Sequence, residues 1–297
     1  MPISNLFKTY IKDRKYLGGL SQETLDSYVD VYKRWIKYIG DEMPTAQNLQ
    51  DWVIAMSEAG LKPTTINISI RSWNVFLNWM FEMEHIKKLY KLQKVKEPKR
   101  KMKAISEEDV EKILKWRPNT KDRMETRLYA MMCILADTGM RIGELLTIKL
   151  DGIYWDDFLI FVIGKGSKER FVPMSVELRK ILYGFIHKYR KAPDHCDLLF
   201  CSINGTKLMY HNMYRDFRVL LERLDIDRRK FDGHFHTFRR FFGKNFLREG
   251  GNTIYLQQIF GHSNIATTEK YVEVEKEDLR RTHKKTSFLS KVKKLLK

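Results

Sequence analysis

Apolar residues recur at every third or fourth position through most of residues 1–93, which is the spacing of helices that bury one face. The pattern predicts four helices here: a short one over 6–16, one from Ser21 to Gly40, one from Thr45 to Gly60, and a longer one after Pro63. Serine and threonine cap helix starts, and glycine commonly ends helices. We expect the tryptophan and methionine side chains on these helices to form a core.

A second helical region begins at Ser106, where Asp109 three positions later completes the pattern of a capped helix start. A strongly apolar helix is predicted from Met124 to Asp137, and Gly139 ends it. Further helices are predicted near residues 176–190 and 212–224, on either side of an Asn204-Gly205 turn.

Between Gly152 and Pro173 the apolar period shifts toward two, the period of a strand. Phe158, Ile160 and Val162 are expected on one side of that strand, and residues 164–166 in the turn of an antiparallel hairpin. The chain is therefore predicted to be mainly α with a small antiparallel β-sheet, an α+β fold.

The same patterns divide the chain into two folded units. We expect a helical unit over residues 1–93, a linker over 94–105, a larger unit over 106–274 and a tail over 275–297. A length of 297 residues suits two domains rather than one.

Net charge narrows the class of partner. The chain has 55 Lys and Arg against 37 Asp and Glu, a net charge of +18. Such an excess favours a polyanion, because neutralising phosphates releases counterions; nucleic acid comes first and a membrane surface is the alternative. Nine basic residues and one acid, Glu97, lie between Lys87 and Lys103. Pro98 blocks a continuous helix, so we expect an extended linker whose lysines contact DNA phosphates.

Apolar runs and cysteines limit the alternatives. The longest uninterrupted apolar run, 128–136, has nine residues, well short of the roughly 20 that span a bilayer. The start, MPISNLFKTYIKDRK, has no signal-peptide core, and three cysteines form no paired framework, so we expect a cytoplasmic protein. His195, Cys196 and Cys201 lack a second Cys/His pair at zinc-finger spacing, so no metal site is predicted.

Six side chains in three stretches point to phosphodiester chemistry. TGMRIGELLTI contains Arg141, GKGSKERFVP contains Lys165, and HFHTFRRFFGKNFLREGGNTIYLQQIFGHSNIATTEKYVEV contains His236, Arg239, His262 and Tyr271. Residues three apart share a helix face, so His236 and Arg239 can point into one pocket. Fixed cationic donors stabilise negative charge that grows on a phosphate under attack. Singly, each residue is typically a solvated charge or a structural side chain; the set distinguishes the site.

The order Arg, Lys, His-x-x-Arg, Gly-His, Tyr resembles that of the tyrosine recombinases, also called phage-type integrases. The resemblance implies a helical core-binding domain at residues 1–93 that lies against DNA, and a catalytic domain at 106–274. It implies site-specific strand exchange through a covalent 3′-phosphotyrosyl intermediate, without a cofactor. The implied partners are double-stranded DNA with paired core sites and a homotetramer on two duplexes; the sequence does not decide whether an accessory DNA-bending protein takes part.

The resemblance also implies roles for the residues that handle the phosphate. Tyr271 is the expected nucleophile; its phenol has an ordinary pKa near 10, so the site must ease its deprotonation. Arg141 and Arg239 are expected to hold the two non-bridging oxygens, because a guanidinium binds phosphate through paired donors and keeps its charge. Glu144 is expected to brace Arg141.

Proton transfer falls to the remaining residues. Lys165 is the expected general acid for the leaving 5′-oxygen, since the pKa of a lysine falls beside other cations. His236 is expected to be a general base or proton shuttle, and His262 a donor to the phosphate. Arg240 stands where the family commonly has a histidine, a departure that affects a helper position.

Two rival functions remain open. A type IB topoisomerase-like enzyme uses a similar site as a monomer, whereas a DNA-binding regulator would keep the fold without cleavage; the complete residue set argues against the regulator. The first predicted helix begins near the amino terminus, so we expect no arm-binding domain ahead of it. That organisation suits the simple Xer-like or mobile-element integrase type.

The tail carries an apolar stripe at helical spacing, made of Phe288, Leu289, Val292, Leu295 and Leu296. Most of its lysines fall on the other side of that helix. It is either a basic end that touches DNA or, as the resemblance implies, a helix that docks on a neighbouring protomer.

Overall fold

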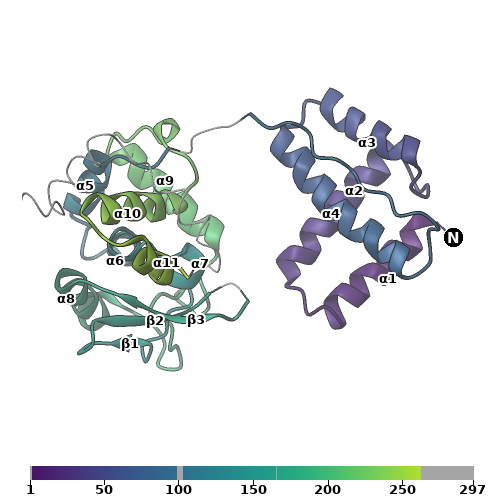
Figure 1. The fold of residues 1–297 in the computed structure, drawn as a ribbon. Coiled ribbons are helices and arrows are strands. Elements are labelled where there is room, and N and C mark those ends of the chain that lie inside the picture. The colour runs from purple at the N-terminus through teal and green to yellow at the C-terminus, as the bar shows by residue number, and fades with distance from the viewer. Residues whose placement is uncertain (1, 99–102, 165, 262–297) are drawn as a thin grey trace, which may run out of the picture. The chain divides into compact units, whose positions relative to one another are not determined.

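A computed structural model describes residues 2–98, 103–164 and 166–261 (Figure 1). The chain divides into two compact units, residues 1–100 and 101–297, and each has its own hydrophobic core. Three predicted site residues, Lys165, His262 and Tyr271, and the tail 275–297 lie outside the described residues. No helix in the described ranges is long and apolar enough to cross a membrane.

The described part of the first unit has the four predicted helices: α1 (Ile3–Tyr16), α2 (Gln22–Tyr38), α3 (Ala46–Glu58) and α4 (Pro63–Glu82). Thr45 caps α3 as expected, in a reciprocal pair of bonds with Asn48. The cap at Ser21 was predicted wrongly: Ser21 precedes α2, but its hydroxyl contacts that of Thr24 at 3.0 Å and not a backbone N–H.

The core of this unit is built on tryptophans. The Trp35 and Trp73 rings stack with centroids 4.6 Å apart, and Trp52 lies 5.5 Å from Trp35 in an edge-to-face arrangement. All three side chains are at most 1% exposed. Such buried aromatic pairs stabilise beyond the area they bury, so the helices are held by one aromatic centre.

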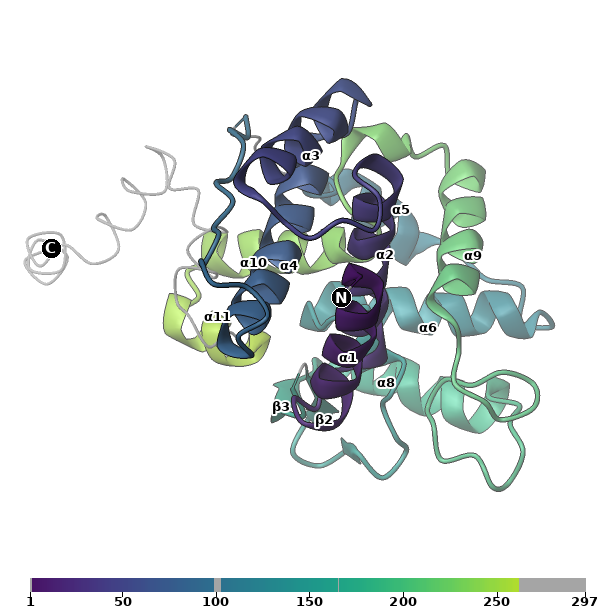
Figure 2. The same cartoon turned by 90° about the vertical axis from the view of Figure 1, so that its right-hand side faces the viewer.

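The second unit is mainly helical, as predicted. Its helices are α5 (Glu107–Lys115), α6 (Arg123–Thr138), α7 (Ile142–Leu145), α8 (Val176–Gly184), the π-helical η1 (Phe185–Tyr189), α9 (Tyr210–Arg223), the short η2 (Arg228–Lys230), α10 (His236–Arg248) and α11 (Thr253–Phe260). Helix α6 is buried along most of its length and packs against α10, as Figure 1 and Figure 2 show. Ser106 caps α5 by accepting from the Asp109 N–H at 3.1 Å.

A three-stranded antiparallel sheet completes the second unit, which confirms the α+β prediction. Its strands β1 (Ile153–Tyr154), β2 (Leu159–Ile163) and β3 (Glu169–Pro173) lie in chain order. Ile160 and Val162 are buried as expected, and Phe158 packs against the same core but lies outside the strand. Phe158 precedes β2 with a φ of 56°, a left-handed conformation that breaks the alternation of a strand.

The first end of the predicted linker is bound to α4. Asn74 exchanges two hydrogen bonds with the backbone of Leu92, at 2.9 and 3.0 Å. About two helical turns earlier, Asn67 exchanges two hydrogen bonds with the backbone of Val95, both at 2.9 Å. Two amide side chains thus fix an extended segment that has no secondary structure of its own.

The other end is bound next to α10. Lys103 exchanges hydrogen bonds with Asp232, from its N–H to the carboxylate and from the Asp232 N–H to its carbonyl, both at 2.8 Å. The Ile105 N–H donates to the Thr237 hydroxyl at 2.7 Å. We call these four residues the linker clasp. Thr237 follows His236 in the chain, so the clasp reaches the start of the helix that carries the His-x-x-Arg pair.

Candidate active site

Arg141 is presented by a tight turn between α6 and α7. Gly139 ends α6 with a φ of +61°, and a Cβ there would lie 2.8 Å from the Phe242 ring, so only glycine fits. Arg141 then occupies the N-cap position of α7, with its side chain 36% exposed. Its backbone N–H and its Nη1 donate to the two carboxylate oxygens of Glu144, at 2.8 and 3.0 Å. The predicted brace is therefore present.

Arg239 lies in the first turn of α10 and is only 1% exposed. Its Nη1 donates to the Gly139 carbonyl at 3.1 Å, and its Nη2 to the Phe260 carbonyl at 2.8 Å. The guanidinium also lies over the Phe260 ring, 3.8 Å from its centroid. This buried cation is held in place on several sides at once.

The structure brings Arg141 and Arg239 together at the carboxyl end of α11. Arg141 Nη1 donates to the Phe260 carbonyl at 3.3 Å, the same oxygen that Arg239 contacts. Carbonyls at a helix carboxyl end carry partial negative charge, which offsets the repulsion between two guanidinium groups. The two cations are thus fixed side by side before any anion binds.

His236 is the first residue of α10, one turn ahead of Arg239. Solvent reaches its imidazole, yet surrounding protein atoms and the guanidinium groups of Arg240, Arg239 and Arg141 lower its pKa to about 4. A neutral imidazole at physiological pH can accept a proton. The predicted pair is therefore electrostatically coupled, with the arginine buried and the histidine exposed.

Glu144 receives a second arginine, Arg170, which the sequence did not single out. Arg170 Nη1 and Nη2 donate to the two Glu144 oxygens, both at 2.8 Å, and its Nε donates to the Ile259 carbonyl at 2.9 Å. Burial alone would raise the pKa of Glu144, but the bonds from Arg170 and Arg141 hold the pKa below its usual value. Glu144 is 4% exposed and stays ionised, which suits a bracing residue.

Arg240, which replaces the common histidine of the family, is 8% exposed. Its Nη1 donates to the Asp232 carbonyl at 2.6 Å, and it lies beside Gly233, whose φ is +67°. Arg240 thus supports the turn that holds the linker clasp and adds positive charge near His236.

The described chain leads directly up to two of the other three predicted residues, Lys165 and His262. Gly164 precedes Lys165, and its N–H donates to the Lys168 carbonyl at 2.7 Å across the β2–β3 turn. Gly261 caps α11 with a φ of +62° and precedes His262. The roles assigned to Lys165, His262 and Tyr271 remain predictions.

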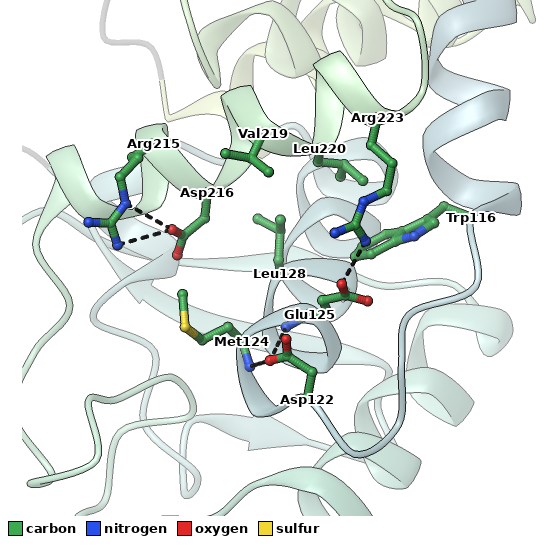
Figure 3. Close-up of a pocket in the computed structure, with 10 residues that line it drawn as sticks. All are labelled: Trp116, Asp122, Met124, Glu125, Leu128, Arg215, Asp216, Val219, Leu220 and Arg223. Atoms are coloured by element: carbon green, nitrogen blue, oxygen red, sulfur yellow. Dashed lines mark hydrogen bonds and ion pairs between the residues drawn. The ribbon is translucent and has the colours of Figure 1, made fainter.

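A cavity of about 240 Å³ lies between α6 and α9, and its lining among the described residues includes no predicted site residue (Figure 3). Trp116, Leu128 and Leu220 form its buried apolar wall. Across the mouth, Glu125 and Arg223 form an ion pair at 2.6 Å. Within the described ranges, no three His, Cys, Asp or Glu side chains are grouped so as to hold a metal ion.

Comparisons with known proteins agree on one family. The model of the phage integrase family matches residues 103–278. The tyrosine recombinase XerD of Halalkalibacterium halodurans is 27% identical over 292 residues, covering 94% of this chain and 96% of that protein.

Two solved structures share the fold. The Tn1549 transposon integrase in complex with circular intermediate DNA matches with a TM-score of 0.77 at 20% identity, over 95% of this chain and 99% of that one. The XerH site-specific recombinase bound to palindromic difH substrate matches with a TM-score of 0.74 at 18% identity, over 95% and 84%.

Proposed function

The chain belongs to the phage integrase family, and on that premise we propose that it is a site-specific DNA recombinase that breaks and rejoins strands through a covalent tyrosyl link. The observation that carries the proposal is the shared contact of Arg141 and Arg239 with the Phe260 carbonyl. Two fixed guanidinium groups side by side match the two non-bridging oxygens of a phosphodiester.

In this mechanism the arginines stabilise charge that develops on the phosphate. When the Tyr271 oxygen bonds to phosphorus, negative charge grows on the non-bridging oxygens, and Arg141 and Arg239 hold donors there. Because the protein has already fixed both groups, little reorganisation is needed at the moment of reaction. Arg141, which is partly exposed, is the one that first meets the DNA.

Two proton transfers accompany the bond changes. Neutral His236 accepts the phenolic proton, directly or through a relay, as Tyr271 attacks. The bond from phosphorus to the 5′-oxygen breaks, and Lys165 gives that oxygen a proton, leaving a 3′-phosphotyrosyl link and a free 5′-hydroxyl. His262 donates to the phosphate. A 5′-hydroxyl from the partner strand then reverses the steps and reseals the DNA, so neither ATP nor a metal ion takes part.

The assembly we propose is four copies of the chain on two duplexes with paired core sites, inside the cytoplasm on nucleoid DNA. The first unit serves as the core-binding domain, and the net charge of +18 supports contacts with phosphates from both units. The basic stretch from Lys87 to Lys103 is suited to cross the DNA backbone, because Val95 within it is fixed to α4 and Ile105 just after it is fixed beside α10.

We further propose that the tail, residues 286–297, docks in the cavity of Figure 3 on a neighbouring copy. The cavity offers an apolar wall, and its polar lining pairs Glu125 with Arg223 and Asp216 with Arg215. The tail offers an apolar stripe flanked by lysines. The match between an apolar wall and an apolar stripe favours the tail as the occupant.

The rivals make different predictions. A type IB topoisomerase-like enzyme would relax supercoiled DNA without pairing two sites, and a regulator would bind DNA without any covalent adduct. Recombination between two sites, dependent on Tyr271, separates the proposal from both.

The test is covalent capture on a nicked suicide substrate, read on a denaturing gel. The unaltered protein should form an adduct, and Tyr271→Phe should bind the same DNA without forming one, because only the nucleophilic oxygen is removed. Tyr255→Phe is the matched control: Tyr255 lies on α11 and is 63% exposed. An adduct that persists in Tyr271→Phe and disappears in Tyr255→Phe would move the nucleophile to Tyr255.

A further inference from the structure

Arg170 is a charged residue on the inward face of a strand. It lies on β3 opposite Val162 of β2. The next pair on the same face of the sheet, two residues along each strand, is the buried pair of Ile160 and Val172. Its side chain is 12% exposed. Burying a guanidinium is costly unless its donors are satisfied, so the residue at this position has a specific partner.

That partner is the Glu144 carboxylate. Two parallel bonds at 2.8 Å join Arg170 to both of its oxygens, which is the strongest and most directional arrangement for this pair. The same carboxylate binds the backbone N–H and Nη1 of Arg141. The Glu144 side chain therefore links Arg141, at the turn between α6 and α7, to Arg170 on strand β3.

Arg170 also supports the carboxyl end of α11, which lies beside β3 (Figure 1). Its Nε donates to the Ile259 carbonyl at 2.9 Å. A Cβ on Gly261 would lie 3.0 Å from the Arg170 Cδ, so Gly261, which ends α11, rests directly on this side chain. The residues that follow lead to His262 and Tyr271.

The same ion pair touches the turn that carries Lys165. A Cβ on Gly164 would lie 3.2 Å from Glu144 Oε1 and 3.3 Å from Arg170 Nη1. Glycine at this position lets the turn approach the pair closely. The Arg170–Glu144 pair is thus in contact with three segments that each precede or contain a predicted site residue.

We propose that Arg170 is a positioning residue for strand cleavage: through Glu144, Ile259 and the contacts with Gly164 and Gly261, it sets the placement of Arg141 relative to the two glycines that precede Lys165 and His262. The inference rests on the proposed function. It does not place Arg170 against the phosphate. A displacement of about 1 Å in a reacting group can cost about a hundredfold in rate, so a single support shared by three segments has a large effect.

The experiment measures single-turnover cleavage of the suicide substrate, recording both the amplitude and the rate constant. Arg170→Met removes the guanidinium and keeps the apolar stem. Arg170→Lys keeps the charge but cannot make two parallel bonds to Glu144 and a third to Ile259. Because Arg170→Met leaves Glu144 buried and unpaired, the double variant Glu144→Gln/Arg170→Met removes both charges and keeps the test valid if the single variant does not fold.

Arg248→Met is the matched control. Its ion pair with Glu107 has the same 2.8 Å separation but is exposed, at the far end of α10. This control should cleave as the unaltered protein does.

We expect the rate constant of Arg170→Met, Arg170→Lys and the double variant to fall about a hundredfold while duplex binding is retained. A merely structural role would lower the amplitude, because fewer molecules are folded, and leave the rate constant unchanged; that result would overturn the proposal. On a 5′-bridging phosphorothiolate, whose leaving group needs no acid, Arg170→Met should recover part of its rate, because one of the supported segments carries Lys165. No recovery at all would remove the Lys165 turn from the proposal.

Failure of the inference is distinct from failure of the proposed function. If the unaltered protein forms no adduct, the function is wrong. If the unaltered protein forms the adduct and the three Arg170 variants form it equally fast, only the role of Arg170 is wrong.

Discussion

Arg141 and Arg239 come from distant parts of the chain and donate to one oxygen, the Phe260 carbonyl, at 3.3 and 2.8 Å. One group is partly exposed and the other is buried. The Phe260 carbonyl therefore holds two guanidinium groups close together before any anion binds. Folding has already placed two phosphate-binding donors, which need little rearrangement when the phosphate binds.

Replacing Arg239 with lysine should abolish this arrangement. Lysine keeps the charge but cannot bond to the Gly139 and Phe260 carbonyls and to a phosphate at once, so cleavage should fall about a hundredfold to a thousandfold, the range seen when one oxyanion donor is lost. The phosphorothiolate substrate should not restore it. Arg229→Lys is the control, at a side chain 91% exposed in an ion pair with Asp227. Cleavage by Arg239→Lys at the control rate would remove the residue from the phosphate site.

Lys165→Ala should cleave ordinary DNA poorly and recover on a 5′-bridging phosphorothiolate. General acid catalysis contributes about a hundredfold to ten-thousandfold, so the recovery should be of that size. Single-turnover rates on the two substrates provide the measurement. Equal defects on both substrates would exclude Lys165 as the acid, and Lys168→Ala, an exposed lysine of the same turn, serves as the control.

The His236 imidazole in DNA-free protein should titrate well below its ordinary pKa of 6.5, near the value of about 4 that burial and three guanidinium groups give it. Arg240→Met removes one positive neighbour and should raise that pKa part of the way back. The native state takes up its proton at lower pH than the unfolded chain, so this histidine costs stability as pH falls from 6.5 toward 4. An NMR titration of the imidazole checks both statements. A His236 pKa of 6.5 in the unaltered protein would contradict them.

Thr237→Val should weaken the linker clasp at its buried end. The Ile105 N–H loses its acceptor. Leaving a buried donor without a partner lowers the free energy of unfolding by about 1–3 kcal/mol, which chemical denaturation measures. Because Thr237 adjoins His236, cleavage should slow while duplex binding stays unchanged. Thr120→Val, at an exposed threonine, is the control. Unchanged stability and cleavage in Thr237→Val would show that the clasp does not support α10.

Deleting residues 286–297 should leave binding to a single site intact and sharply reduce two-site complexes and recombination. Val219→Lys should do the same, because Val219 is a 47% exposed member of the cavity lining and a lysine there repels a basic, apolar tail. Ile203→Lys, at a 75% exposed side chain outside the cavity, is the control. Band-shift and recombination assays decide the matter, and normal two-site complexes in both altered proteins would reject the docking.

Most of the fold was predictable because apolar periodicity reports which faces are buried. The helices of the first unit and the order of helices and strands in the second follow from it. Phe158 packs against the core as predicted but lies outside β2, because a residue with left-handed φ interrupts a strand without changing its apolar spacing. Ser21 failed because its hydroxyl has an alternative partner in Thr24.

The sequence predicts a set of site side chains, but not how the described ones, Arg141, His236 and Arg239, are arranged. The convergence of Arg141 and Arg239 depends on a backbone carbonyl, and carbonyls leave no mark in a sequence. Arg170 did leave a signal: it lies two residues before Val172 on the same, core-facing side of β3. A charge at an inward position requires a buried partner. Asp232 and Thr237 offered no such pattern, since single polar residues before a helix are common.

The linker clasp also decides where an isolated catalytic fragment can begin. A fragment starting at Ser106, the N-cap of α5, would discard the backbone groups of Lys103 and Ile105 that bind Asp232 and Thr237. It would keep every predicted catalytic side chain and yet lose a support beside His236. A fragment that begins ahead of Lys103 retains these bonds. The activity of a truncated protein therefore depends on residues 103–105, which carry out no chemistry.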